Sequence, residues 1–475
     1  MDHVHDDQPT RSPWLAQLAP EGSAQPLTSD VETDVVVVGA GIAGISTAFF
    51  VLRDTDLRVT LIERARVGHG ATGHNAGQLT TYFERPLSSI ADEFGTDLAT
   101  QAQRGIEEAH DLLDLMVVES GADVLVERFI GQMALYTLDH VVVHLTTNEV
   151  RRAGGLAPLR CSVADDAPFL ADIPESFAGG YDDVPRTRIH ELLGIPDDRY
   201  CAVVSEPKGC ANGALLCQQV LAYLQSAHPD RFRYADLTGV DEVLLGAATD
   251  DDSRHRVTAG DVHVLGRHVV LCTNAFTDHA VRDRHGDPVE LATDQSLSGL
   301  VGFMAAFVDS PREPAALSFV RQPIVGMDQT PYAYTTRRSY PGPDGTVTLT
   351  CMGGPDAYLD DAEYASDAPV PGQVLDAMDR EILPFAAPER QPGTPYDFHW
   401  HGLMGYTDNL LRIVGTHPDH AGLHYNLACN GVGFLPSIYG GHRIGRILAG
   451  DRLGPSIFDP RSPAARAVGD DAASP

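Results

Sequence analysis

The feature that most constrains the fold is a glycine-rich turn near the start of the chain, in residues 34–44 (DVVVVGAGIAG). Four consecutive valines predict a strand buried on both faces, and a helical pattern begins directly after the glycines. Gly39 permits a tight turn, Gly41 lets the backbone approach a ligand, and Gly44 lets the helix pack closely on the strand. Because the N–H groups that open such a helix can bind phosphates, the segment predicts a Rossmann-type dinucleotide-binding unit.

An acidic residue ends the next predicted strand. This strand reads RVTLIE and ends at Glu63, nineteen residues after Gly44. A carboxylate at this place accepts hydrogen bonds from a ribose diol, and it favours an adenosine ribose without a 2′-phosphate. We assign Arg64, which follows Glu63, and Ile42 and Ala43, which open the helix, to the same site.

The composition limits the possible partners and the cell compartment. The 475 residues carry 34 Lys and Arg against 66 Asp and Glu, a net charge of −32, which argues against a nucleic acid partner. The seven cysteines form no CxxC motif, and no apolar stretch is long enough for a signal core or a membrane span. We therefore expect a cytoplasmic protein with free thiols and no membrane partner.

The elements expected along the chain are interleaved, so that one body is built from separated segments. Apolar patterns predict helices around 90–120 and 215–224, a buried strand from 267, an antiparallel sheet over 300–355, and a last strand and helix at 423–428 and 434–449. The predicted fold class is α/β, with a Rossmann-type domain made of discontinuous segments and an α+β domain with a mixed antiparallel sheet. The expected segments are an arm at 1–30, the nucleotide-binding domain at 31–89, 205–290 and 395–459, the second domain at 90–204 and 291–394, and a flexible tail at 460–475.

A second glycine-rich loop follows the nucleotide motif, at residues 68–78 (GHGATGHNAGQ). It resembles the GASGRNGG element that runs under the flavin in the D-amino-acid-oxidase-like superfamily of FAD enzymes, which includes glycine, sarcosine and γ-glutamylputrescine oxidases. Trp14 and the block 400–433 also resemble that superfamily. The resemblance implies FAD as the cofactor and, beside the residues of the first motif, the following FAD-binding residues: Gly70, Ala71, Thr72, His74, Asn75, Ala76, Gly77, Gln78, Val240, Thr273, Asn274, Arg412, Gly431, Val432, Gly433 and Phe434.

Two interpretations of His74 remain open. In the dimethylglycine and sarcosine dehydrogenase branch, a histidine in a similar loop carries covalent flavin, and aligning the glycines places His74 on that position. In the other interpretation His74 is a hydrogen-bonding residue of the loop, because Gly73 and Asn75 follow the non-covalent pattern. A second covalent route in the superfamily uses a cysteine before the terminal block, where this chain has Met404.

The turn at residues 430–433 (NGVG) precedes the last predicted helix, and Pro436 suits the first turn of that helix. Reduced flavin carries negative charge on its pyrimidine side. We expect the backbone N–H groups of the turn, and the positive end of the helix, to stabilise that charge.

An arginine in the predicted antiparallel sheet is the candidate for holding a substrate carboxylate. The segment YAYTTRR, ending at Arg338, resembles the family strand that carries such an arginine, whose fork matches both carboxylate oxygens. The spacing from Tyr334 favours Arg338 over Arg337, and strand alternation lets only one of the two point inward. A pair of surface arginines is the alternative.

Three side chains near the end of the chain complete the expected catalytic set. His401 or His399, together with Tyr406, is expected on the pocket wall over the flavin. The two histidines at i, i+2 could instead face one metal ion, but no carboxylate or cysteine at ligand spacing accompanies them, so no metal is expected. In sarcosine-oxidase-like enzymes a lysine near the flavin promotes the reaction with O2, and Lys208, in an expected loop, is the chain's single lysine.

The resemblance implies an FAD-dependent oxidase or dehydrogenase of amines or amino acids. Such an enzyme transfers a hydride from the substrate to flavin N5, the imine product hydrolyses, and O2, giving H2O2, or an electron carrier takes the electrons. An FAD-dependent 2-hydroxy-acid dehydrogenase on the same fold is the alternative. An RNA-modifying flavoprotein is a third possibility, against which the acidity argues, and a folate-coupled subunit a fourth, against which the short tail argues.

Overall fold

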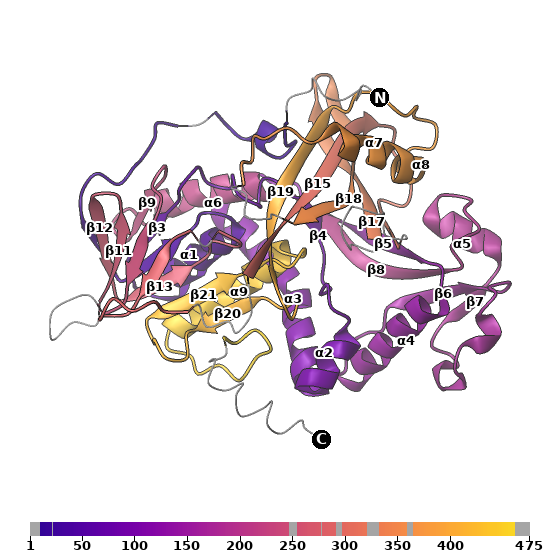
Figure 1. Ribbon diagram of the computed structural model, residues 1–475, viewed down its shortest axis with the longest axis horizontal. Helices are drawn as coiled ribbons and strands as arrows, with labels where there is room; N and C mark the ends of the chain where they lie inside the picture. The colour runs from indigo at the N-terminus through magenta and orange to yellow at the C-terminus, as the bar shows by residue number, and fades with distance from the viewer. Residues whose placement is uncertain are drawn as a thin grey trace.

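The computed structural model describes residues 10–20, 22–246, 254–276, 278–290, 297–320, 332–358 and 364–460. The expected tail after Pro460 and the first nine residues of the expected arm lie outside this part of the chain, as do the acidic clusters at 250–252 and 360–361, which we expect to be solvated. Three sheets organise the described residues (Figure 1).

A six-stranded sheet carries the glycine motif. Its order is β20-β21-β13-β2-β3-β9, and all neighbours are parallel except the edge pair β20–β21. Strands from the start, middle and end of the chain thus lie side by side, which confirms the predicted Rossmann-type domain of discontinuous segments. The strands are β2 (Val35–Val38), β3 (Val59–Ile62), β9 (Phe232–Ala235), β13 (His268–Leu271), β20 (Ile413–Thr416) and β21 (Leu423–Leu427).

Helices cover one face of this sheet, and a second, five-stranded sheet covers the other. Val35 and Val37 point to the helices, whereas Val36 and Val38 pack with the small sheet, so the valine run is buried on both sides as predicted. The small sheet has the order β1-β12-β11-β10-β14. Its strands are β1 (Val31–Glu32), β10 (Glu242–Leu244), β11 (His255–Ala259), β12 (Val262–Gly266) and β14 (Ala280–Arg282).

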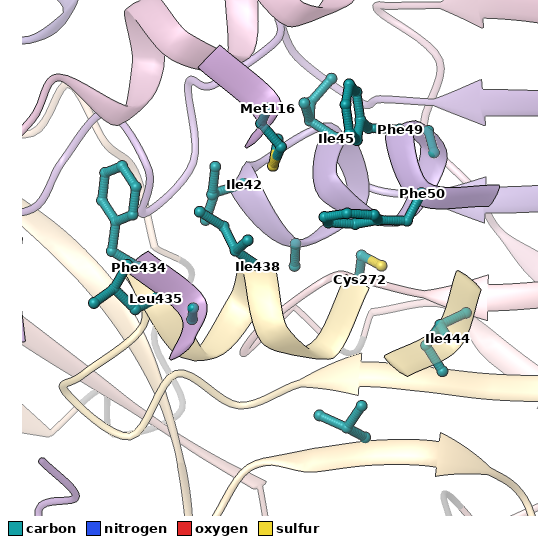
Figure 2. Close-up of a cluster of buried hydrophobic side chains, with 14 of the residues drawn as sticks. Ile42, Ile45, Phe49, Phe50, Met116, Cys272, Phe434, Leu435, Ile438 and Ile444 are labelled. Carbon is teal, nitrogen blue, oxygen red and sulfur yellow. The ribbon is translucent and has the colours of Figure 1, made fainter. Parts of the chain in front are cut away.

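The first and last helices of the nucleotide-binding domain pack against each other. A Cβ on Gly441 of α9 would overlap Ser46, and one on Gly445 would lie 2.8 Å from Cβ of Phe50, so the helix pair needs both glycines. Figure 2 shows Ile42 of α1 beside Ile438 of α9 in the core that this contact forms. The helices on this face are α1 (Ile42–Asp54), α2 (Leu87–Phe94), α3 (Thr96–Ser120), α6 (Gly213–Ala227) and α9 (Phe434–Leu448).

A ten-stranded sheet forms the second domain, with the order β19-β15-β18-β17-β16-β5-β8-β6-β7 and β4 paired to β8. Helices cover one face (Figure 1). Trp14 and Trp400 pack on the other. The helices are α4 (Leu138–Ala153), α5 (Arg186–Leu193), α7 (Gly372–Glu381) and α8 (Leu383–Ala386), and the short 3-10 turns are η1 (Leu15–Gln17), η2 (Leu170–Asp172) and η3 (Glu175–Phe177). The strands are β4 (Gln78–Leu79), β5 (Glu127–Leu135), β6 (Arg160–Ala164), β7 (Asp182–Val184), β8 (Ala202–Cys210), β15 (Leu297–Asp309), β16 (Ala316–Val320), β17 (Tyr332–Gly342), β18 (Gly345–Tyr358) and β19 (Phe398–Thr407).

The structure differs from the expected segments in several places. Strands β4 and β19, and β8 from Ser205 on, lie in segments assigned to the nucleotide-binding domain, yet they pair in the large sheet. Lys208 lies on β8 rather than in a loop. The helix expected at 90–120 is two helices, because Gly95 between them has φ +84°. None of the helices in the described part of the chain is long and apolar enough to cross a bilayer.

Two buried histidines, His255 and His424, and the half-buried His268 meet where the small sheet packs on the six-stranded sheet. His268 Nδ1 lies 3.1 Å from His424 Nε2, and His424 Nδ1 lies 3.0 Å from Thr416 Oγ1. His255 of β11 adds its ring to the same cluster, and its Nδ1 accepts a bond from the Gly246 N–H. Burial and the neighbouring histidines lower the pKa to about 4 for His255 and about 3 for His424.

Other charged groups act on this cluster. His420 disfavours the charged form of His255, whereas His268 faces both Arg267, which lowers its pKa, and Asp34, which raises it. Burial lowers the pKa of His268 more than Asp34 raises it. The folded protein therefore keeps the cluster neutral at a pH where the unfolded chain protonates its histidines.

We predict that the protein loses stability as the pH falls below about 6.5, the ordinary pKa of histidine. Because the folded-state pKa values are lowered, the stabilisation is complete above that pH, and it decreases by about 2 kcal/mol for each of His255 and His424 down to about pH 5. Urea unfolding across this range should show the loss. The His424→Gln variant should have a shallower pH dependence, and the control His263→Gln, outside the cluster, should keep the wild-type slope. Equal slopes in all three proteins would contradict the prediction.

Candidate active site

One cavity joins the nucleotide-binding domain to the large sheet. Its wall includes the glycine turn at the end of β2, the loop 68–78, the start of α9, and side chains of β15, β17, β18 and β19. The carboxyl ends of parallel strands in a Rossmann-type sheet are the usual place for a ligand, and the cavity lies there. All of the FAD-binding residues expected from the sequence line it except Gly44, Gly70 and Gly77.

The glycine turn has the geometry that the sequence predicts. Gly39 has φ +101°, and a Cβ there would lie 2.7 Å from the carbonyl oxygen of Cys272. A Cβ on Gly44 would overlap the carbonyl oxygen of Gly39, which explains why Gly44 supports the turn without lining the cavity. The Ile42 N–H donates to Thr72 Oγ1 at 2.9 Å, so the second loop is tied to the first turn of α1.

Glu63 fixes the turn from the end of β3. Its Oε2 accepts from the Ala40 N–H at 2.7 Å, and its Oε1 accepts from the Ala65 N–H at 2.8 Å. Burial raises the pKa of its carboxyl group, although these two bonds act in the opposite direction. Glu63 and Arg64 both line the cavity, as expected, and the Arg64 guanidinium stacks on Phe276 at 3.7 Å from the ring centre.

Two tryptophans hold the second loop from behind. The indole N–H groups of Trp14 and Trp400 both donate to the carbonyl oxygen of Asn75, the latter at 3.2 Å. Asn75 Oδ1 accepts from the Gly77 N–H at 2.6 Å, and Gly77 has φ +70°. Gly77 therefore shapes the loop and faces the tryptophan, while its neighbours line the cavity. At Gly70 a Cβ would meet nothing within 4 Å.

His74 is buried in this loop, with 8% of its surface exposed, and lines the cavity. Its Nδ1 lies 3.0 Å from the carbonyl oxygen of Gly70. A carbonyl can only accept, so Nδ1 carries the proton and Nε2 keeps a lone pair. Burial lowers the pKa of His74, which favours the neutral ring.

The start of α9 closes the cavity on another side. Asn430 and Gly431 both have positive φ, +43° and +72°, and the Asn430 side chain accepts from the Thr407 N–H at 2.9 Å. Asn274 Oδ1 accepts from the Cys429 N–H at 3.0 Å, which joins the turn after β13 to this loop. The N–H groups of the first turn of α9 have no acceptor within the helix and are suited to an anion.

Arg412 is a buried cation of the nucleotide-binding domain. Its Nη2 donates to Asn426 Oδ1 at 2.8 Å, and Asn426 in turn donates to the Ser437 carbonyl oxygen of α9. Burial lowers the pKa of Arg412 to about 10. Arg412 lines the cavity, as expected from the sequence.

The expected carboxylate anchor does not line the cavity. Arg338 points to the face of β17 that carries Trp14, and its guanidinium lies 4.5 Å from the Trp14 ring, behind the loop at Gly77. Arg337 points to the opposite face and donates to the carbonyl oxygens of Pro314 and Ala386 at 2.6 and 2.8 Å. The two arginines do lie on opposite faces, as alternation requires, but Arg338 is separated from the cavity by the loop.

Strand alternation also separates His401 from Tyr406. The two residues are five positions apart on β19, so their side chains point to opposite faces. Tyr406 lines the cavity, whereas His401 packs on Phe303 and bonds the Ala368 carbonyl oxygen at 2.9 Å and the Tyr364 hydroxyl at 3.2 Å. His399 lies on the same face as His401, so neither histidine lies over the cavity.

Several lining residues were not expected. Thr80 and Tyr82 continue the alternation that begins at Gln78, and all three line the cavity. Asp356 of β18 and Tyr334 of β17 line it from the large sheet. The alternation of residues 78, 80 and 82 is visible in the sequence and could have identified Thr80 and Tyr82. Nothing in the sequence marks Asp356.

The model of the family described as FAD dependent oxidoreductase (DAO) matches residues 34–447. The chain belongs to this family. Among sequences, the gamma-glutamylputrescine oxidoreductase of Escherichia coli (strain K12) is 37% identical over 73 residues, 15% of this chain and 17% of that protein. The chain thus aligns with less than a fifth of the length of that relative.

Solved structures of other proteins share the fold of this family member. Glycine oxidase from Geobacillus kaustophilus superposes with a TM-score of 0.62 at 15% identity, over 90% of this chain and 98% of that one. L-proline dehydrogenase from P. horikoshii superposes with a TM-score of 0.65 at 14% identity, over 91% and 97% of the two chains. At these identities the similarity concerns the fold.

FAD is the cofactor of this family, and the residues of the cavity fit it. Gly39 and Gly431 line the cavity with positive φ, a conformation that favours glycine, so no side chain fills the cavity at these two positions. At Gly41 a Cβ would lie 3.0 Å from Thr72 Oγ1. Two helix N-termini, of α1 and α9, reach the cavity and provide N–H groups for phosphate and flavin oxygens. Glu63 would bind the adenosine ribose of the bound dinucleotide.

We predict that Glu63→Gln weakens FAD binding about ten- to a hundredfold, since a hydrogen bond to a charged group contributes roughly 1.5–3 kcal/mol. The measurement is FAD titration of the apoprotein, followed by flavin fluorescence. Glu32→Gln, which changes an exposed glutamate of β1, is the control and should keep the wild-type affinity. Tight FAD binding by Glu63→Gln would exclude the assigned role.

Proposed function

We propose that this FAD-dependent oxidoreductase oxidises a carbon–nitrogen bond of an amine or amino acid. A hydride leaves the carbon, a proton leaves the nitrogen, and water hydrolyses the resulting imine to a carbonyl compound and an amine or ammonia. The observation that supports this most is that one cavity joins the dinucleotide motif to the large sheet. We call its part on the large sheet, lined by Met304, Tyr334 and Tyr406, the chamber. The named substrates of the similar proteins, glycine, L-proline and gamma-glutamylputrescine, all contain such a bond.

The bound FAD would supply the hydride acceptor, and the protein would supply position and electrostatics. The chamber wall of Tyr334, Tyr406 and Met304 would orient the substrate carbon and exclude water from it. Burial raises the pKa of Tyr406, so its phenol stays protonated and can donate a hydrogen bond. The first turn of α9 would stabilise negative charge on the reduced cofactor.

The acceptor of the electrons is O2, giving H2O2, or an electron carrier. Lys208 does not line the cavity but lies next to Tyr82, which does. Its Nζ is 5.2 Å from the ring centre of Tyr82. Glu206 Oε1 at 2.9 Å balances its charge. We place the enzyme in the cytoplasm, because the seven cysteines are unpaired and six of them are buried.

We predict that amines or amino acids, rather than 2-hydroxy acids, bleach the flavin absorbance of the purified holoenzyme under anaerobic conditions. The reason is that a substrate with a C–N bond would deliver its hydride directly to FAD, and this step needs neither O2 nor an electron carrier. A panel of both classes, mixed one by one with the enzyme, identifies the class, and admitting air while measuring H2O2 then separates O2 from a carrier. Bleaching by hydroxy acids alone would replace the proposal with the hydroxy-acid dehydrogenase.

We further propose that His74 can bind the flavin covalently. Its ring is neutral, faces the cavity and keeps a lone pair on Nε2, which are the requirements for a nucleophile toward the activated flavin methyl group. In the alternative, His74 is only a hydrogen-bonding residue of the loop and forms no covalent bond to the flavin. In this reaction one C–H bond of the flavin methyl group would break and Nε2 would bond to that carbon, while the methyl proton and the Nδ1 proton would be released to water. The electron pair would remain on the flavin, which would stay bound in reduced form until O2 takes up two electrons and two protons to give H2O2.

If the bond forms, acid-precipitated protein should keep its yellow colour and its in-gel fluorescence. His74→Ala should release the flavin on precipitation, because the variant lacks the side chain that forms the covalent bond and the other contacts are lost on denaturation. His69→Ala, a change of the half-buried histidine of the same loop, is the control and should keep the flavin in the pellet. Flavin that appears wholly in the wild-type supernatant would exclude the bond.

A further inference from the structure

Arg338 is a buried cation without an ion pair. Only 5% of its surface is exposed, and its Nη1 has no hydrogen-bond partner. Within the described part of the chain its guanidinium makes one long hydrogen bond, from Nε to the carbonyl oxygen of Ser339 at 3.5 Å, and no salt bridge. Burying an unpaired charge costs free energy, so a cation kept in this position needs an explanation.

The acid of this region, Glu127, is bonded to other groups. It accepts from the Ser339 N–H at 3.1 Å and from Ser339 Oγ at 2.8 Å, and the Cys210 thiol lies 3.4 Å from it. Burial raises the pKa of both Cys210 and Cys351 to about 12, and the charge of Arg338 opposes this rise at each thiol. The charge of Arg338 therefore acts on its surroundings.

Arg338 stands directly behind the loop that lines the cavity. A Cβ on Gly77 would lie 3.0 Å from Arg338 Nη1, and the neighbours of Gly77 on both sides line the cavity. Gln78 Nε2 donates at 2.6 Å to Thr336 Oγ1, which lies two residues before Arg338 on the same face of β17. Tyr334, two residues further back on this face, lines the cavity itself. The loop is therefore the layer between the cation and the cavity.

The peptide that joins Asn75 to Ala76 is held from the same side as the cation. Trp14 and Trp400 both donate to the Asn75 carbonyl oxygen, and neither tryptophan lines the cavity. The peptide is trans, so the Ala76 N–H points away from the tryptophans. Ala76 lines the cavity, and its N–H has no acceptor within the described residues. The loop therefore presents a hydrogen-bond donor to the cavity.

Arg338 also fixes one of the two tryptophans. Its guanidinium lies 4.5 Å from the Trp14 ring, and the Trp14 and Trp400 rings meet edge to face with their centres 6.2 Å apart. The Trp14 ring is thus held between a cation and a second indole, which keeps its N–H directed to the Asn75 carbonyl oxygen. One cation and two N–H dipoles therefore lie behind the loop, opposite the cavity.

We infer that Arg338, Trp14 and Trp400 form an electrostatic support that raises the affinity of the bound FAD for electrons. A hydride carries one negative charge, so hydride transfer to the cofactor adds one negative charge to the cavity. The Ala76 N–H would donate to a cofactor atom that gains this charge, and the Arg338 cation would stabilise the charge through the loop. Arg338 is thus a positioning residue behind the cofactor, and the inference holds whichever substrate class supplies the hydride.

The test measures the midpoint potential of the holoenzyme by equilibration with a redox dye. Arg338→Met keeps a long side chain without the charge, and it should lower the equilibrium constant for two-electron reduction about tenfold, which equals a fall of about 30 mV. Arg338→Lys keeps the charge and should restore most of the wild-type potential. The matched control is Arg337→Met, which removes the neighbouring buried arginine on the opposite face of β17 and should keep the wild-type potential.

Binding of oxidised FAD separates the charge effect from damage to the fold. Oxidised FAD lacks the added charge, so Arg338→Met should bind it nearly as tightly as the wild-type protein does. A role confined to folding would instead lower the melting temperature of the apoprotein and leave the potential of the holoenzyme unchanged.

Sulfite is a second probe, and it needs no substrate. It adds to oxidised flavin and leaves a negative charge there, so its Kd for the holoenzyme, measured from the loss of flavin absorbance, should rise about tenfold in Arg338→Met. Trp14→Phe and Trp400→Phe each remove one N–H and keep a ring, and each should raise this Kd about three- to tenfold. The double variant should exceed either single one.

A wild-type potential and a wild-type sulfite Kd in Arg338→Met would overturn the inference. Equal losses in Arg338→Met and Arg338→Lys would overturn it as well, because the charge would then be irrelevant. If Arg338→Met yields no holoenzyme, the two tryptophan variants decide, and an unchanged sulfite Kd in both excludes the support. Bleaching by hydroxy acids alone would remove the proposed function and leave this inference standing.

Discussion

The rest of the structure depends on one contact, the approach of the first helix to the turn that precedes it. Gly44 lies against the carbonyl oxygen of Gly39, with no room for a Cβ, and this sets the position of α1 on the sheet. The last helix then packs on α1 through Gly441 and Gly445. Two helix N-termini are thereby brought to one cavity, although their residues stand almost four hundred positions apart in the sequence.

Local motifs were enough to predict the nucleotide-binding part of the structure. The glycine turn, Glu63 and the loop 68–78 are recognised from short sequence segments, and the structure has them where the sequence predicts. The location of Arg338 could not be predicted in this way. It depends on Trp14, more than three hundred residues earlier in the chain, which occupies the space beside it.

The prediction of the residues on the substrate side of the cavity failed for two different reasons. The separation of His401 from Tyr406 follows from counting an odd number of positions along one strand, so the sequence alone was sufficient to exclude their common role. Asp356 is different, because the register of β15 and β18 shifts between Gly302 and Met304. Such a shift changes which residues face each other, and no local pattern in the sequence announces it.

The double hydrogen bond to the Asn75 carbonyl also has a consequence for biosynthesis. Trp14 leaves the ribosome first, Asn75 soon afterwards, and Trp400 only when most of the chain has been made. The strand β21 and the helix α9, which complete the sheet and the cavity, come later still. Proteins of this length fold in part while they are being synthesised, but here the pocket wall stays incomplete until translation is nearly finished, because β19 and the start of α9 are made last. A nascent chain stalled before residue 400 would therefore hold an open half-site.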